Sequence, residues 1–155
     1  MAEMPVAGGT TAVPAQQTPP LSTLAANNAP RLIDRFGRVH RSLRVSVIDA
    51  CNIRCQYCMP AEGVQFLPQQ QLLSFEQIEA FVRTAVELGI RKVRLTGGEP
   101  LLRAELALLV ARLHAIDGLQ QIALTTNGML LARHIDELVA AGLQRINISL
   151  DTLSE

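Results

Sequence analysis

The chain has 155 residues, in which 14 Lys and Arg balance 14 Asp and Glu. This balance, with one Tyr and no Trp, argues against a basic nucleic-acid binder and against an aromatic base-stacking platform. The hydrophobic share of 48% is enough for a core and excludes global disorder, while no apolar run reaches the ~18 residues of a membrane span. All three Cys lie between Cys51 and Cys58. Their odd number excludes a fully paired disulfide framework, and their clustering indicates a metal site.

Residues 1–30 differ in composition from the rest of the chain. They hold five of the eight Pro and a single charge, Glu3, and they show no hydrophobic period. We therefore predict a disordered extension rich in Ala, Pro and Thr over residues 1–30. The segment lacks the basic start and apolar centre of a secretory signal and the Arg residues of a mitochondrial transit peptide. We expect a cytoplasmic protein.

From residue 31 onward, strand-like and helix-like segments alternate. One helix is predicted to start at Ser74, where Gln77 completes a capping box, and to stop at Gly89. The other predicted elements are strands at 43–48, 92–96, 122–126 and 145–150, and helices at 101–116 and 131–141, the last stopped by Gly142. The order βαβαβαβ predicts a parallel sheet with helices packed on a face.

The predicted strands alternate apolar and polar residues, which indicates one apolar and one polar sheet face. Arg44 and Arg94 share the polar face. A parallel sheet covered by helices on both faces should read as nearly continuous apolar runs instead. We interpret the polar face as the inside of an open or ligand-filled barrel, where two Arg suit an anionic ligand. The alternative is a face that meets solvent or another chain.

The predicted fold class is α/β, a parallel βα-repeat forming part of a TIM-type barrel. Four strands leave two free sheet edges, so we expect residues 31–155 to be the truncated N-terminal part of a longer barrel. Residues 151–155 read as a loop and the first turn of a further helix.

The chemistry-bearing motifs all follow predicted strands. Cys51, Cys55 and Cys58 form C-x3-C-x2-C after the first strand. Three thiolates can hold an iron–sulfur cluster and leave one iron open, whereas structural zinc wants a fourth protein ligand. The sequences TGGEP (96–100), TTNG (125–128) and SLD (149–151) follow the next three strands. Each reads in isolation as turn or capping chemistry, but together they line the rim where α/β folds bind ligands.

With these motifs the sequence resembles the radical S-adenosylmethionine superfamily, which places C-x3-C-x2-C after the first strand and GGEP after the second. Within it, the chain is most similar to the GTP 3′,8-cyclase family of molybdenum-cofactor biosynthesis. The stretches that carry this resemblance cover about residues 35–153: FGRVHRSLRVSV, CNIRCQYCMP, FLPQQQLLSFEQI, VRLTGGEPLLR, LTTNGMLL and AGLQRINISLDTL.

The resemblance implies ligands for three sets of residues. Cys51, Cys55 and Cys58 would bind a [4Fe–4S] cluster. S-adenosylmethionine would chelate the one iron of this cluster that has no cysteine ligand. The positions that match S-adenosylmethionine contacts are Tyr57, Gly98, Glu99 and Ser149, with Glu99 on the amino group. The positions that match GTP contacts are Arg44, Arg94 and Thr125. No catalytic side chain is assigned.

The resemblance also implies an activity and partners. A 5′-deoxyadenosyl radical would abstract hydrogen from GTP, whose ribose carbon then attacks C8 to give (8S)-3′,8-cyclo-7,8-dihydroguanosine 5′-triphosphate. This is the first step of molybdopterin synthesis. A reductant such as flavodoxin or ferredoxin, a downstream cyclic pyranopterin monophosphate synthase and a homodimer are further expectations. A second, C-terminal [4Fe–4S] cluster is expected in full-length members, but its ligands are absent from this sequence, so we expect no cyclisation by this chain alone.

One local departure and two alternatives remain. The family's usual Thr-Asp-Arg-Cys is Ile48-Asp49-Ala50-Cys51 here, which spares the cysteines. The first alternative is another radical enzyme of the superfamily that acts on a peptide or small molecule. The second is a non-catalytic iron–sulfur fragment.

Overall fold

The computed structural model describes residues 31–60 and 62–150. Along them, strands and helices alternate in the predicted order: β1 (Ser42–Ser46), α1 (Phe75–Glu87), β2 (Lys92–Thr96), α2 (Leu106–His114), β3 (Gln121–Thr126), α3 (Leu131–Ala140) and β4 (Arg145–Ile148). Two short 3-10 helices, η2 (Gln69–Gln71) and η3 (Pro100–Leu102), precede α1 and α2. The predicted extension at 1–30 and the predicted loop and helix start at 151–155 lie outside the described residues.

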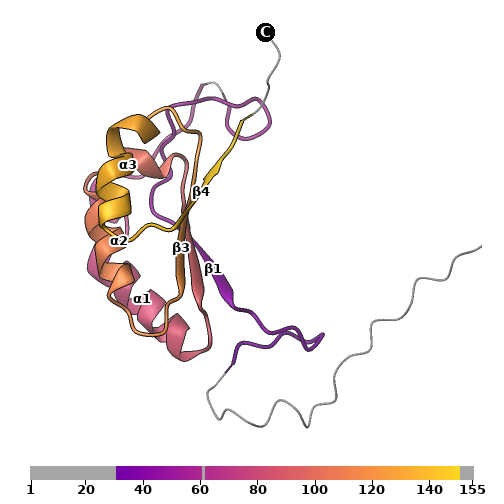
Figure 1. The fold of residues 1–155 in the computed structure, drawn as a ribbon. Coiled ribbons are helices and arrows are strands. Elements are labelled where there is room, and N and C mark those ends of the chain that lie inside the picture. The colour runs from indigo at the N-terminus through magenta and orange to yellow at the C-terminus, as the bar shows by residue number, and fades with distance from the viewer. Residues whose placement is uncertain (1–30, 61, 151–155) are drawn as a thin grey trace, which may run out of the picture.

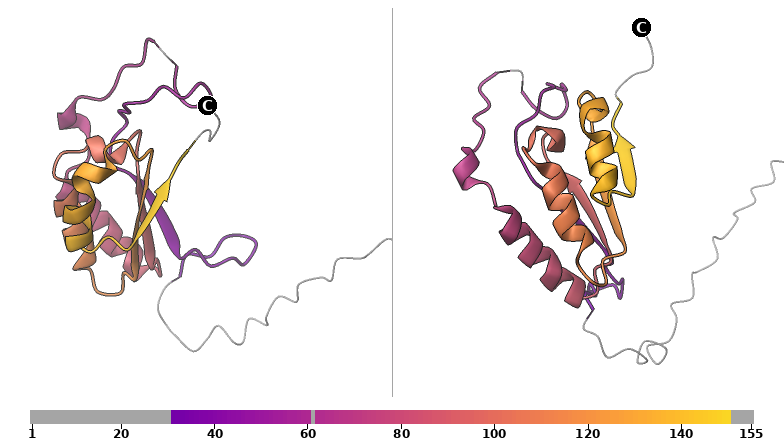
Figure 2. Two further views of the ribbon diagram at one scale, coloured as in Figure 1. Left: turned by 45° about the horizontal axis from the view of Figure 1, so that its top comes forward. Right: turned by 60° about the vertical axis from the view of Figure 1, so that its left-hand side comes forward.

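The four strands form one parallel sheet in the order β1-β2-β3-β4. The three helices pack on one face of this sheet, and the other face is left without a helix by the described residues (Figures 1 and 2). Parallel neighbours joined by helices are the repeating unit of α/β barrels. The predicted α/β class and partial-barrel architecture are therefore confirmed.

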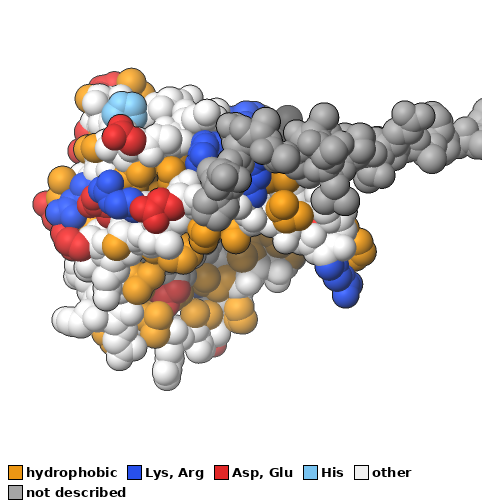
Figure 3. Space-filling view, turned by 90° about the horizontal axis from the view of Figure 1, so that it is seen from below, with side chains coloured by type: hydrophobic (Ala, Val, Ile, Leu, Met, Phe, Trp, Pro, Cys, Tyr) orange, Lys and Arg blue, Asp and Glu red, His pale blue; other side chains and the backbone are white. Residues whose placement is uncertain are grey.

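The outer surface carries charges of both signs. Seen from the end opposite to the cysteine-bearing loop, Lys and Arg side chains lie beside Asp and Glu side chains at the left of the molecule (Figure 3). Across the two outer helices α1 and α2, Arg112 pairs with Glu76 at 2.6 Å and with Glu79 at 3.4 Å. Within the part of the chain that the structure describes, no helix is both long and apolar enough to cross a membrane.

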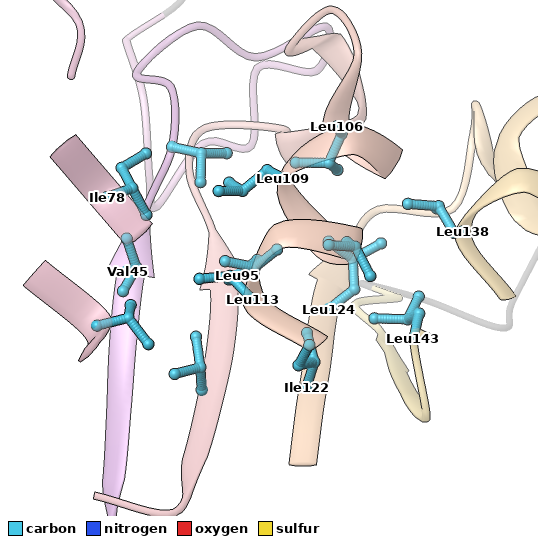
Figure 4. Close-up of a cluster of buried hydrophobic side chains, with 14 of the residues drawn as sticks. Val45, Ile78, Leu95, Leu106, Leu109, Leu113, Ile122, Leu124, Leu138 and Leu143 are labelled. Carbon is cyan, nitrogen blue, oxygen red and sulfur yellow. The ribbon is translucent and has the colours of Figure 1, made fainter. Parts of the chain in front are cut away.

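The core lies between the helices and the apolar face of the sheet. Every second residue of the strands, such as Val45, Leu95 and Leu124, points toward the helices (Figure 4). Leu109 and Leu113 of α2 fill the centre, each with 0% of its surface exposed. Because burying one such side chain stabilises the fold by about 1.5–3 kcal/mol, this layer supplies the main force that holds helices to sheet.

The predicted ends of the first and third helices are confirmed. The Ser74 hydroxyl accepts a hydrogen bond from the Gln77 backbone N–H, and the Gln77 side chain accepts one from the Ser74 N–H, which completes the capping box. Gly89 and Gly142 follow α1 and α3 with φ of 99° and 103°, a conformation that glycine adopts without strain.

The second helix was predicted at 101–116 and this is wrong at its start, since α2 begins at Leu106. Residues 100–102 instead form η3, capped by the Glu99 side chain, which accepts from the Leu101 N–H. Glu105 then takes a left-handed conformation with φ of 58°, which separates η3 from α2. Both Leu101 and Leu106 reach the core because the chain turns between them.

The remaining boundaries either match, as for β2, or differ by one or two residues. β1 ends at Ser46 rather than 48 and β4 at Ile148 rather than 150, because the paired register ends there: Ser46 pairs with Thr96 and Ile148 with Thr126.

Candidate functional site

The carboxyl ends of the four strands meet at one edge of the sheet, as parallel pairing requires. The long segment between β1 and α1, which contains the cysteines, passes over this edge (Figure 1, top). The edge therefore brings together the cysteine motif, the TGGEP motif after β2 and the TTNG motif after β3, as the strand order predicted.

The cysteine loop, residues 51–59, is built on a tight turn. The N–H groups of Cys58 and Met59 both donate to the Cys55 carbonyl, at 2.9 and 3.1 Å. Such an i to i+3 bond holds the ends of the turn within about 7 Å, so Cys55 and Cys58 are neighbours in space. The Arg54 guanidinium donates to the Cys51 carbonyl at 2.7 Å. The first two cysteines are half-buried and Cys58 is exposed.

The residues present fit an iron–sulfur cluster by their donor chemistry. Three thiols within eight residues match the three protein ligands of a cluster that keeps one iron open, and thiolates are the ligands that iron–sulfur clusters take. Within residues 31–60 and 62–150, no three His, Cys, Asp or Glu side chains converge on a common point as a metal ion would require. The fit to an iron–sulfur cluster therefore rests on the donor chemistry of the three cysteines and on the Cys55–Cys58 turn, and not on a convergence of their sulfur atoms.

The two glycines of TGGEP are needed by the chain itself. A Cβ at Gly97 would lie 2.5 Å from the Ile48 carbonyl oxygen, and one at Gly98 would collide with the carbonyl group of Ala50. The backbone N–H of Gly98 donates to the Ile48 carbonyl at 2.7 Å. Residues 48–50 therefore fill the space beside the Cα atoms of Gly97 and Gly98.

Glu99 is a buried carboxylate, with 1% of its surface exposed. Its Oε1 accepts from the Leu101 N–H at 3.1 Å and from the Thr126 hydroxyl at 2.6 Å, and its Oε2 accepts from the Asn127 N–H at 2.8 Å. The side chain thus joins the end of β2 to the end of β3. Two donors occupy Oε1, so the acceptor position still open lies on Oε2.

The polar face of the sheet contains a hollow of about 390 Å³ lined by three cations. Arg44 and Arg94 are direct partners in the register of β1 and β2, and Lys92 lies two residues before Arg94 on the same face. None of the three pairs with an acidic side chain among the described residues. The predicted pair of Arg is therefore brought together, and sequence reasoning left Lys92 out of the site although its parity in the strand indicated it.

Thr125 lies on the same face, one strand further along. It is the register partner of Asn147 in β4, and the Thr125 Oγ1 and the Asn147 Oδ1 are both buried without a hydrogen-bond partner in residues 31–60 and 62–150. A buried polar atom without a partner lowers the stability of the fold by about 1–3 kcal/mol. Such atoms are typical of places where a ligand or a water molecule supplies the hydrogen bond. Asn147 was not among the predicted site residues, although it too shares the parity of Arg44.

The remaining predicted residues, Tyr57 and Ser149, lie at the rim. Tyr57 is 79% exposed on the cysteine loop. Ser149 is exposed beyond the end of β4, where its N–H donates to the Thr126 carbonyl at 2.9 Å.

Comparisons with known proteins bear on the family. A family model described as "Radical SAM superfamily" matches residues 45–155. The chain is 58% identical over 123 residues to "GTP 3′,8-cyclase" of Xanthomonas axonopodis and 53% identical over 125 residues to the protein of that name from Rhodopirellula baltica. These matches cover 77% and 80% of the chain and 37% and 35% of the relatives. A "Molybdenum cofactor biosynthesis protein 1" of Mus musculus is 54% identical over 122 residues, which are 79% of the chain and 19% of that protein.

A solved structure of BtrN in an open conformation shares the fold. It superposes with a TM-score of 0.56 at 20% identity, over 76% of this chain and 53% of that one. The chain spans little more than a third of the length of the bacterial relatives named above. The matched family model, which extends from β1 through the cysteine motif to the last residue, shows that the chain belongs to the radical SAM superfamily.

Proposed function

We propose that this chain forms the cluster-binding and part of the GTP-binding portion of a GTP 3′,8-cyclase, which converts GTP to (8S)-3′,8-cyclo-7,8-dihydroguanosine 5′-triphosphate. The names and the 53–58% identity of the bacterial relatives support this activity. The observation that carries it in the structure is the hollow on the polar face, where three cations lie without an acidic partner among the described residues.

In this proposal Cys51, Cys55 and Cys58 hold a [4Fe–4S] cluster at the rim of the sheet. When bound, the cluster and S-adenosylmethionine supply the one-electron chemistry that begins hydrogen abstraction from the substrate. The residues proposed to contact S-adenosylmethionine are Tyr57, Gly98, Glu99 and Ser149. The acceptor position on Glu99 Oε2 that no described donor occupies suits an ammonium group. Gly98 would contribute its backbone carbonyl, because its N–H already donates to the Ile48 carbonyl.

Arg44, Arg94 and Lys92 are proposed to bind the triphosphate together. Guanidinium groups bind phosphate oxygens through paired, charge-assisted hydrogen bonds. Because these cations have no competing carboxylate among the described residues, their charge is available to an anion. The Thr125 hydroxyl is proposed to donate to or accept from the substrate at the same face, since it has no hydrogen-bond partner in the part of the chain that the structure describes.

The proposal includes the partners expected of this activity. A low-potential reductant such as flavodoxin or ferredoxin delivers the electron, and a cyclic pyranopterin monophosphate synthase consumes the product. Homodimer formation and a cytoplasmic location complete it.

GTP binding tests the substrate assignment. Calorimetry at low salt should show GTP affinity for the chain falling at least tenfold in Arg44→Ala and Arg94→Ala, since each removes a charged contact with phosphate. The matched control is Arg133→Ala, an exposed Arg on the helix side of the sheet, which should bind like the wild type. Equal affinity in all four proteins would favour the alternative of a radical enzyme with another substrate.

Cofactor loading is tested separately. Anaerobic reconstitution should give about four irons per chain and the spectrum of a [4Fe–4S] cluster, lost in Cys55→Ser. A preparation that takes up stoichiometric zinc and no iron would refute the cluster assignment.

A further inference from the structure

Asn127, in the TTNG motif after β3, is a junction of three hydrogen bonds. Its backbone N–H donates to Glu99 Oε2 at 2.8 Å. Its side-chain Oδ1 accepts from the Met129 N–H at 3.1 Å, which closes the turn into α3. Its side-chain Nδ2 donates to the Oδ1 of Asn52 at 2.8 Å, across 75 residues of sequence.

Asn52 is the residue that follows the first cysteine. Its own Nδ2 lies 3.8 Å from the Met129 sulfur, so both ends of its amide face the segment after β3. By contrast, the side-chain hydrogen bonds of Arg54 and the Cys55–Cys58 turn lie within the loop. Asn52 is thus a side chain that ties the cysteine loop to the sheet edge.

The other end of this tie is rigid. Glu99 is buried and receives three donors, one from η3 and two from the end of β3, which restrict its position to one geometry. The backbone hydrogen bond to Glu99 in turn restrains Asn127. The series of hydrogen bonds Glu99–Asn127–Asn52 therefore restrains the residue beside Cys51 relative to a buried group.

We propose that Asn127 and Asn52 form a positioning bridge, which sets the cysteine loop at a defined height over the ends of β2 and β3, where S-adenosylmethionine is proposed to bind. This inference rests on the proposed cluster and cofactor. In this inference the bridge acts through the loop that carries the thiols. Glu99 then has a role in the site through its protein partners, in addition to the proposed contact with an ammonium group.

Substitutions at Asn52 isolate the bridge, because they leave the β3 turn intact. Asn52→Ala removes the acceptor, whereas Asn52→Asp keeps a carboxylate oxygen for the Asn127 Nδ2 and loses only the contact with Met129. Gln56→Ala is the matched control, since Gln56 lies on the same loop and makes no side-chain hydrogen bond with the described residues. Asn127→Ala and the Asn52→Ala/Asn127→Ala pair complete a double-mutant cycle.

The first measurement is hydrogen exchange of the metal-free chain by mass spectrometry. The rate of amide exchange over residues 51–59 should rise three- to tenfold in Asn52→Ala, which corresponds to the free energy of one hydrogen bond. The rate should stay near that of the wild type in Asn52→Asp and Gln56→Ala. The double variant should raise exchange in this segment by less than the two single effects combined, since both changes remove the Asn52–Asn127 bond. Unchanged exchange in Asn52→Ala, or additive effects in the pair, would overturn the bridge.

The second measurement is titration of the reduced, reconstituted chain with S-adenosylmethionine, followed by the electron paramagnetic resonance spectrum of the cluster. Asn52→Ala should take up the same iron as wild type but require three- to tenfold more S-adenosylmethionine, with Asn52→Asp restoring the affinity. Normal affinity in Asn52→Ala would show that the bridge is structural only, and would refute the positioning role. A wild-type chain that holds no cluster would refute the proposed function instead, while the exchange data still decide whether the bridge exists.

Discussion

Replacing Glu99 by Gln tests the view that this buried carboxylate holds the ends of β2 and β3 together. The change keeps the shape of the side chain and removes one acceptor oxygen. If the amide oxygen faces Leu101 and Thr126, the amide nitrogen faces the Asn127 N–H, and two donors then meet 2.8 Å apart. The turned amide leaves Leu101 and Thr126 without an acceptor instead.

The expected loss follows from these contacts. The partly buried Asn127 N–H left without an acceptor costs about 1–2 kcal/mol, the lower part of the range for buried groups, and two bonds that change from a charged to a neutral acceptor each weaken by about 0.5–1 kcal/mol. Because Glu99 is 1% exposed, water cannot replace the lost acceptor. We therefore expect the free energy of unfolding of Glu99→Gln to fall by about 2–4 kcal/mol.

Urea unfolding of the metal-free chain under reducing conditions measures this change. Glu87→Gln is the control: it makes the same substitution at the exposed last residue of α1, and should alter stability by less than about 0.5 kcal/mol. A Glu99→Gln chain as stable as the control would refute the reasoning, since it would mean that the three donors are satisfied without the carboxylate.

Three further changes test other parts of the fold. Ser74→Ala removes the hydroxyl of the capping box and should lower stability in urea by about 1 kcal/mol; no loss would show that the cap is redundant. Gly98→Ala places a Cβ against the Ala50 carbonyl, so we expect a loss of about 1–3 kcal/mol together with faster proteolysis of the cysteine loop, and a wild-type cleavage rate would contradict the close approach. The third concerns pH. The hydrogen bond from its own backbone N–H, aided by the Ser74 hydroxyl and by Arg112, holds the pKa of Glu76 below its ordinary value of 4.5. The folded chain thus favours the charged form, and this contribution to stability is present above the ordinary pKa and is lost as pH falls through the lowered one. A carboxyl NMR titration of Glu76 at or above 4.5 would refute it.

The elements that sequence reasoning located well are those defined by short-range contacts. The Ser74 cap depends on Gln77, three residues away, and the alternation that placed Arg44 and Arg94 on one face is a property of each strand alone. The failure at residues 101–105 has the opposite cause. Leu101 fits a helical pattern, but its N–H binds Glu99, whose position depends on donors from β3.

The sequence by itself therefore determined the parallel βα order, the polar face with its paired Arg, and the clustered thiols at the rim. Only the tertiary structure decided what fills the space between the motifs. Residues 48–50 lie against the glycines of TGGEP, and Asn127 reaches Asn52 across 75 residues. Such contacts join segments that neither periodicity nor spacing relates, because they arise only when β1, β2 and β3 lie side by side and end at one edge.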